Sequence, residues 1–117
     1  MLSLTQKTGH WAEELASRFL EQRGLRLLNR NYQCRYGEID LIMEHDDALV
    51  FVEVRYREDT CCGSSAETID ARKRERLLKT AQHYLRTSAK DQPCRFDAVL
   101  IEGLKAQPRI EWVTGAF

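Results

Sequence analysis

The sequence predicts a single α/β domain in which one mixed β-sheet is flanked by helices. A chain of 117 residues is long enough for one hydrophobic core but not for two. Two segments repeat apolar residues at helical spacing, and shorter segments between and after them have the apolar patterns of strands. The order is helix, three strands, helix, two strands (αβββαββ), which is typical of one mixed sheet with helices packed against it.

The first helix is expected over residues 8–23, and a strand, LRLLNRNY, over residues 25–32. Thr8 is the predicted N-cap and Gly24 ends the helix. Apolar residues recur every four positions in this helix, namely Trp11, Leu15 and Phe19.

The next two strands form a predicted hairpin. Residues 38–44 (EIDLIME) and 49–56 (LVFVEVRY) have strand patterns, and residues 45–48 form the polar turn between them. The small and polar segment over residues 57–67 is expected to be a mobile loop.

The second half of the chain contributes one helix and two strands. The helix begins near Asp70 and ends near Arg86. The strand RFDAVLIEG, residues 95–103, is almost continuously apolar, which suits a central position in the sheet. RIEWV, residues 109–113, is a short last strand. The apolar stripe of the helix comprises Leu77, Leu78, Ala81, Tyr84 and Leu85.

Composition restricts the function classes. The formal net charge is zero, whereas nucleic-acid-binding proteins often carry a basic excess, so binding to phosphates must use a local patch. No apolar run approaches the roughly 18 residues of a membrane span, and the first residues lack the apolar core of a signal peptide. We therefore expect a cytoplasmic protein that does not enter a membrane.

The four cysteines are expected to be reduced thiols. They form no CxxC pair, and no histidine lies at zinc-binding spacing, which argues against a zinc site. Cys61 and Cys62 are adjacent, which would be unusual in a disulfide framework. The other two are Cys34 and Cys94.

Asp40 and Glu53 are expected to meet across the hairpin. Side chains alternate along a strand, so Glu38 and Asp40 share one face, and Glu53 shares a face with Arg55. A turn of two or four residues makes paired residue numbers sum to 93, which places Asp40 opposite Glu53. A turn of three residues would shift the register and separate them.

Two opposed carboxylates repel each other by roughly 1–4 kcal/mol at about 4 Å. Either a proton on one acid or a cation between them can offset this repulsion. Mg²⁺ suits the site, because it takes few carboxylates together with water and phosphate oxygens. The alternative is a surface salt-bridge cluster of Asp40, Glu53 and Arg55. The apolar residues around both acids favour a partly buried site.

A third acid could come from the first helix. Glu13 lies at the edge of the apolar stripe, whereas Glu14 points further out. Glu13 could therefore lean toward the hairpin. The alternative is a solvated glutamate near the helix N-terminus, where the helix dipole favours it.

An acid on one strand followed by Glu-x-Lys on the next is the core pattern of the PD-(D/E)XK nuclease superfamily. Asp40 and EVR, residues 53–55, resemble this pattern. Nearly the whole chain resembles the YraN-like family of small bacterial proteins. The matching residues are Thr8-Gly9, Glu13, Ala16, Leu20, Gly24-Leu25, Asn31, GEIDLI, FVEVRYR, Lys73, Ala81, Leu85 and RFD.

The resemblance implies a restriction-endonuclease-like fold, close in outline to Holliday junction resolvases. It implies that Asp40 and Glu53 bind Mg²⁺ or Mn²⁺ together with the Val54 backbone carbonyl, and that Glu13 completes the acid cluster. Nucleases of this fold often act as dimers, so the resemblance also implies a homodimer. Asp97, in RFD, is expected to bond Arg95 or a backbone amide.

Two positions depart from the superfamily pattern. Ile39 replaces a proline, and Arg55 replaces the lysine. Arginine stays protonated and cannot act as a base, although it can stabilise charge on a phosphate.

Basic residues around the acids could follow a phosphate backbone, or could be solvated cations of an ordinary helix face. They are Arg57, Arg72, Lys73, Arg76 and Lys79.

The sequence thus predicts a Mg²⁺-dependent nuclease-like protein that acts on DNA, branched or single-stranded forms included. The acids Glu13, Asp40 and Glu53, with Arg55, are its candidate catalytic residues. The alternatives are a non-catalytic nucleic-acid-binding or scaffold protein that keeps the fold, and a structural interaction module whose acids form salt bridges. Arg55 and the zero net charge favour the non-catalytic binding or scaffold protein, whereas the acid trio favours the enzyme.

Overall fold

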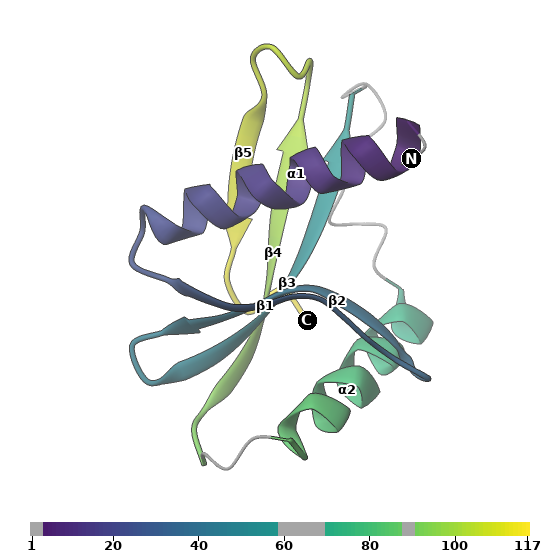
Figure 1. The fold of residues 1–117 in the computed structure, drawn as a ribbon, viewed down its shortest axis with the longest axis vertical. Helices are drawn as coiled ribbons and strands as arrows, with labels where there is room; N and C mark the ends of the chain where they lie inside the picture. The colour runs from purple at the N-terminus through teal and green to yellow at the C-terminus, as the bar shows by residue number, and fades with distance from the viewer. Residues whose placement is uncertain (1–3, 59–69, 88–90) are drawn as a thin grey trace.

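Two helices and five strands make up the described part of the chain. The structure is a computed structural model that describes residues 4–58, 70–87 and 91–117. Its elements follow the order αβββαββ, which confirms the predicted fold class (Figure 1). Residues 59–67 of the loop expected over 57–67 lie outside the described residues. The elements are α1 (Leu4–Glu21), β1 (Arg26–Cys34), β2 (Gly37–His45), β3 (Ala48–Arg57), α2 (Ala71–Leu85), β4 (Cys94–Glu102) and β5 (Arg109–Val113).

The five described strands form one mixed sheet in the order β1-β2-β3-β4-β5. β3 and β4 pair in parallel, and the other neighbouring strands pair antiparallel. α2 belongs to the long connection that parallel pairing requires between β3 and β4. The apolar run in β4 correctly predicted a central strand, since residues 97–101 are all buried.

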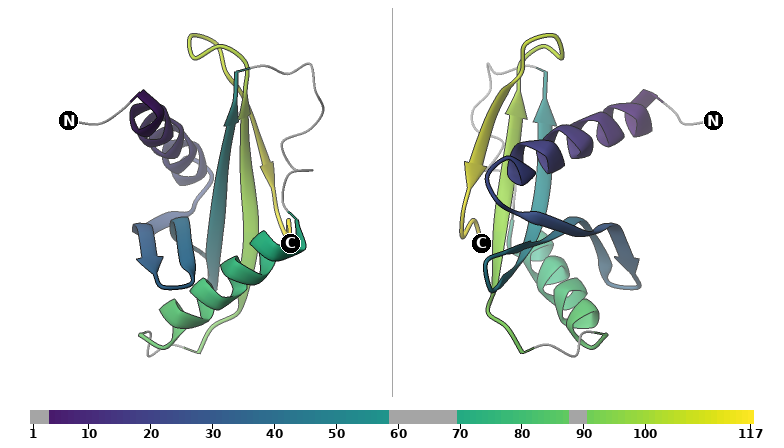
Figure 2. Two further views of the ribbon diagram at one scale, coloured as in Figure 1. Left: turned by 90° about the vertical axis from the view of Figure 1, so that its right-hand side faces the viewer. Right: turned by 60° about the vertical axis from the view of Figure 1, so that its left-hand side comes forward.

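One helix covers each face of the sheet (Figure 2). Ala16 and Leu20 of α1 are fully buried against one face, in a cluster with Val52 of β3. Leu77 of α2 packs against the other face with Phe51. Full burial of a side chain such as leucine contributes about 1.5–3 kcal/mol, so this second cluster holds α2 firmly beside β2 and β3.

The predicted start of the first helix was wrong. α1 begins at Leu4, so Thr8 lies inside it and is not its N-cap. Threonine costs less than about 0.7 kcal/mol in a helix interior, so an N-cap residue type alone does not define a helix start. Thr8 instead accepts a hydrogen bond from Lys105 Nζ at 2.9 Å.

The other boundaries lie close to their predicted positions. β1 covers Arg26–Cys34, where residues 25–32 were expected, and α2 begins one residue after Asp70. The Asp70 side chain caps α2 by accepting the Lys73 N–H at 2.8 Å. Neither described helix has both the length and the apolar character needed to cross a membrane.

The hairpin of β2 and β3 has the predicted register. His45 pairs with Ala48 across a turn of two residues, so that paired residue numbers sum to 93. Asp46 adopts a φ of 55°, a backbone conformation that aspartate tolerates in turns. The ladder continues to the pair of Leu41 with Val52.

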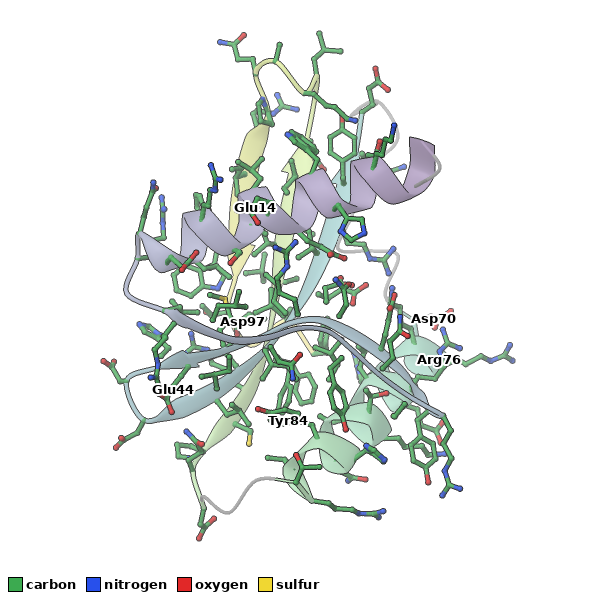
Figure 3. The ribbon with its side chains drawn as sticks, in the orientation of Figure 1. Glu14, Glu44, Asp70, Arg76, Tyr84 and Asp97 are labelled. Carbon is green, nitrogen blue, oxygen red and sulfur yellow. The ribbon has the colours of Figure 1, made fainter. Side chains whose placement is uncertain are left out.

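Asp97 of β4 is a fully buried acid (Figure 3). It accepts hydrogen bonds from Arg95 Nε at 3.1 Å and from the Gly115 amide at 3.1 Å, as the sequence led us to expect. It also accepts one from Trp112 Nε1 at 2.9 Å, which was not foreseen. Asp97 therefore connects β4 to β5 and to the C-terminal segment.

Candidate functional site

β2 departs from β3 next to the predicted acids. The recorded ladder ends at Leu41 and Val52, although the register would continue with Val54 opposite Ile39. The Val54 N–H donates to Asp40 Oδ2 at 2.8 Å, so this carboxylate takes the place of the Ile39 carbonyl. Ile39 and Ile42 lie in the same cluster although they are three positions apart, which shows that strict alternation is interrupted near Asp40.

A cavity of about 270 Å³ lies between the hairpin strands and α2. The two acids lie in it with cationic side chains from the first two turns of α2, where Figure 3 labels Arg76. We call this cavity the acid pocket. It is lined by Gly37, Glu38, Asp40, Glu53, Lys73, Arg76 and Leu77.

Asp40 has a strongly raised pKa. Burial, and then the negative charge of Glu53, raise the pKa of Asp40 to about 8, while the hydrogen bond from the Val54 amide lowers it. The charges of Glu13 and Glu38 raise it further. In the absence of a cation, Asp40 is therefore mostly protonated at neutral pH. The repulsion expected from the register is relieved by a proton when no metal is bound.

Glu53 is buried and has two cationic neighbours. Its side chain is 8% exposed, and Lys73 Nζ lies 2.6 Å from Glu53 Oε1. Arg55 Nε lies 3.4 Å from the same oxygen, but it is buried without any hydrogen-bond partner. Arg55 thus attracts Glu53 without making a directed bond. The ion pairs of this arrangement thus join the buried Glu53 to Lys73 and Arg55, whereas Asp40 accepts the Val54 N–H.

Glu13 is not part of a compact acid trio. It approaches Arg30 at 3.9 Å, and no group of three or more potential metal-binding side chains occurs within residues 4–58, 70–87 and 91–117. Its charge nevertheless reaches Asp40. Glu14 bonds Arg18 at 2.8 Å and Arg30 at 2.7 Å.

The predicted basic residues do not all lie at the acid pocket. Lys73 and Arg76 line it. Lys79 forms an ion pair with Glu75 at 3.1 Å, and Arg72 is exposed on α2. Arg57 is four positions after Glu53, roughly 13 Å along the strand.

The oxygen donors of the pocket fit a hard divalent cation. Mg²⁺ binds through one or two carboxylates and completes its shell with water and phosphate oxygens, so Asp40 and Glu53 suffice. The N–H and C=O of a strand residue point to the same edge. Because the Val54 N–H reaches Asp40, the Val54 carbonyl also points toward β2, which suits its predicted role as a ligand. A cation must compete with the proton on Asp40 and with Lys73 at Glu53.

Sequence reasoning missed the ion pair between Lys73 and Glu53. Eleven undescribed residues separate β3 from the cap of α2, and no residue pattern specifies how the helix crosses the sheet. The role of Gly37 was also missed. A Cβ at Gly37 would lie 3.3 Å from Thr80 Oγ1, so this glycine lets the hairpin approach α2. The only sequence signal for it is a glycine at the start of a strand.

The Gly37→Ala variant is expected to lose about 1–3 kcal/mol of unfolding free energy. Gly37 has a φ of +150°, and the fully buried Thr80 cannot retreat easily because its hydroxyl donates to the Arg76 carbonyl at 2.8 Å. Urea titration measures the loss. Gly9→Ala is the control: it has open space in α1, so it should gain about 0.5–1 kcal/mol. A Gly37→Ala variant as stable as the wild type would contradict this close packing.

Comparison with known proteins identifies the family. The profile of the uncharacterised protein family UPF0102 matches residues 12–101. A UPF0102 protein of Nitrosomonas europaea is 51% identical over 99% of this chain and 98% of its own length. UPF0102 proteins of Nitrosococcus oceani and Pseudomonas aeruginosa are 50% and 45% identical, each over 93% of this chain and 90% of its own length. The resemblance to the YraN-like family is thereby confirmed, and the chain belongs to the uncharacterised protein family UPF0102.

Proposed function

We propose that this protein is a divalent-metal-dependent nuclease that hydrolyses phosphodiester bonds in DNA. The observation that carries the proposal is the acid pocket. It brings the half-buried Asp40, which has a pKa of about 8, and the buried Glu53 together with the cations Lys73 and Arg76. An acid with a strongly perturbed pKa, such as Asp40, lying in a cleft is characteristic of a functional site. Adjacent cations suit a substrate with negative charges.

Asp40, Glu53 and the Val54 carbonyl would hold the cation. Bound Mg²⁺ or Mn²⁺ supplies Lewis acidity toward a phosphoryl oxygen and the activation of a water. Asp40 would bind such a cation as the carboxylate, because a nearby positive charge favours the ionised form. Glu53 would be the second carboxylate ligand, and its ion pair with Lys73 would compete with the cation.

Lys73 takes the role that Arg55 cannot fill. Its Nζ lies 2.6 Å from Glu53 Oε1, so a Lys73 released from Glu53 would remain beside the acids. A lysine can take part in proton transfer, whereas an arginine stays protonated. Arg55 and Arg76 then act as fixed positive charges that stabilise the phosphate as negative charge develops on it.

DNA is the proposed substrate because the cations of this region line one side of α2. Arg72, Lys73, Arg76 and Lys79 belong to that helix, and Arg57 ends β3. Their local concentration offsets the zero net charge of the whole chain.

A non-catalytic DNA-binding protein is the second candidate function. The ion pair of Lys73 with Glu53 favours it, since a neutralised Glu53 is a weaker cation ligand. In this case the pocket binds a phosphate through Lys73 and Arg76 without hydrolysis.

Cleavage of labelled duplex, single-stranded and four-way DNA in Mg²⁺ or Mn²⁺ tests the proposal. We expect Asp40→Asn to abolish cleavage, and Lys73→Met to slow it by roughly 10²–10⁴-fold, the usual contribution of a proton-transfer group. Lys105→Met, in the turn between β4 and β5, is the matched control and should cleave at the wild-type rate. Binding without cleavage by the wild type would support the second candidate, and cleavage by Asp40→Asn would refute the assigned site.

A further inference from the structure

A second cavity of about 230 Å³ lies further along α2. We call it the tyrosine pocket. It adjoins the acid pocket, because Tyr36 precedes Gly37 in the chain and Lys79 lies one helical turn after Arg76. Both cavities thus occupy the groove between α2 and the turn that joins β1 to β2. The tyrosine pocket is lined by Tyr36, Lys79, Gln82, His83 and Arg86.

The tyrosine pocket differs chemically from the acid pocket. Its lining contains Lys79 and Arg86 but no acid. Lys79 is paired with Glu75, whereas Arg86 makes no ion pair with a carboxylate of the described residues. A phosphate would therefore meet cationic side chains here without a competing carboxylate in the wall.

Tyr36 provides an aromatic wall with fixed neighbours. The Arg35 guanidinium lies over the Tyr36 ring, 4.9 Å from its centre, and the His83 ring lies 6.4 Å from that centre in a T-shaped arrangement. His83 is held in turn by a hydrogen bond of 2.5 Å between its Nδ1 and the Tyr32 hydroxyl. Aromatic rings and guanidinium planes are the surfaces on which unstacked nucleic-acid bases stack, so a base could stack on the part of the Tyr36 ring that Arg35 leaves open.

The size of this cavity suits one base. Cavities for drug-sized ligands measure roughly 300–1,000 Å³, so 230 Å³ suits a smaller group, such as one base. His83 follows Arg76 by seven positions, about 10 Å along the helix axis, which is about three nucleotides of a stacked strand. A strand that crosses the acid pocket can thus reach the tyrosine pocket.

We propose that the tyrosine pocket binds an unpaired nucleotide of a DNA strand whose phosphodiester lies in the acid pocket. Tyr36 stacks on the base, and Lys79 and Arg86 contact the flanking phosphates. A paired base stays stacked within its duplex and does not reach this wall, so the pocket selects DNA with a single-stranded segment. This inference rests on the proposed action on DNA and adds the class of substrate.

Binding of fluorescent dT₁₂ and of a blunt duplex, measured by anisotropy in EDTA, tests the inference without cleavage. We expect Tyr36→Ala to weaken dT₁₂ binding by roughly 5- to 100-fold and duplex binding much less. Tyr36→Phe should retain dT₁₂ affinity because it keeps the ring. Arg86 is exposed, so the Arg86→Glu variant should stay folded, and it should also bind dT₁₂ more weakly. Arg109→Ala, on the edge strand β5, is the control and should bind like the wild type.

Three results would overturn the inference, and one would support it. Unchanged dT₁₂ affinity in both Tyr36→Ala and Arg86→Glu would place the pocket outside the interface. If Tyr36→Ala weakened the binding of dT₁₂ and of the duplex equally, the pocket would contact phosphates alone and would not stack on a base. Binding of dT₁₂ that depends on Tyr36, without cleavage of any DNA, would support the pocket and refute the nuclease. Cleavage of DNA by a protein whose dT₁₂ binding does not depend on Tyr36 would support the nuclease and refute the pocket.

Discussion

The metal-free wild type is expected to lose unfolding free energy when the pH rises from about 5 to about 8. This loss should exceed that of the Asp40→Asn variant by on the order of 3 kcal/mol. The pKa of Asp40 is about 8 in the folded protein and near its ordinary value of 3.8 in the unfolded chain. Between these values the folded state binds the extra proton. The contribution is complete below pH 3.8 and is lost as the pH rises through 8. Asparagine does not titrate, so the Asp40→Asn variant does not lose this unfolding free energy as the pH rises.

Urea denaturation of both proteins across this pH range, with a chelator present, measures the difference. Subtracting the two curves removes the titration of all other groups. Asp91→Asn removes an exposed carboxylate outside the acid pocket and should follow the wild type. Parallel curves for the wild type and Asp40→Asn would mean that Asp40 is ionised in the folded protein.

The same proteins separate a metal site from a salt bridge. At about 100 times its dissociation constant, Mn²⁺ should stabilise the wild type by about 2.7 kcal/mol, and it should stabilise Asp40→Asn much less. The effect should grow toward pH 8, because the cation binds the ionised carboxylate. A wild type that does not respond to Mn²⁺, together with a destabilised variant, would lead us to abandon the metal site.

The Asp97→Ala variant is expected to lose on the order of 3–5 kcal/mol of unfolding free energy. The fully buried carboxylate accepts bonds from Arg95, Trp112 and the Gly115 amide, and its removal leaves all three donors without this acceptor. Urea titration followed by tryptophan fluorescence measures the loss. Glu111→Ala removes an exposed acid from the neighbouring strand, and it should change stability by less than about 0.5 kcal/mol. Similar stabilities of the two variants would refute the structural role of Asp97.

The part of the fold that depends on local pattern could be predicted. The polar turn at Asp46 and Asp47 set the register of β2 and β3, and this register brought Asp40 and Glu53 together. Apolar spacing located both helices, and Asp70 marked the start of α2. These features follow from strand alternation, helical periodicity and turn chemistry, each of which acts over a few residues.

The features that depend on tertiary packing could not be predicted. The end of the ladder at Leu41 comes from the divergence of two strands, and this divergence lets Asp40 bond the Val54 amide. The contact of Lys73 with Glu53 depends on how α2 crosses the sheet. Sequence alone assigned Lys73 to a phosphate-binding surface, because its partner lies twenty positions earlier and no local pattern connects them.

The parallel pairing of β3 with β4 has a consequence for the order in which the site is assembled during folding. Leu49 pairs with Cys94, forty-five positions later, whereas β1, β2 and β3 are joined by short turns. Entropy of loop closure delays contacts between distant residues, so the hairpins can form before the parallel pair. Asp40 and Glu53 belong to the early strands, and Lys73 belongs to the crossover. A folding chain therefore brings the two acids together first and gains their lysine counter-charge only when the crossover closes.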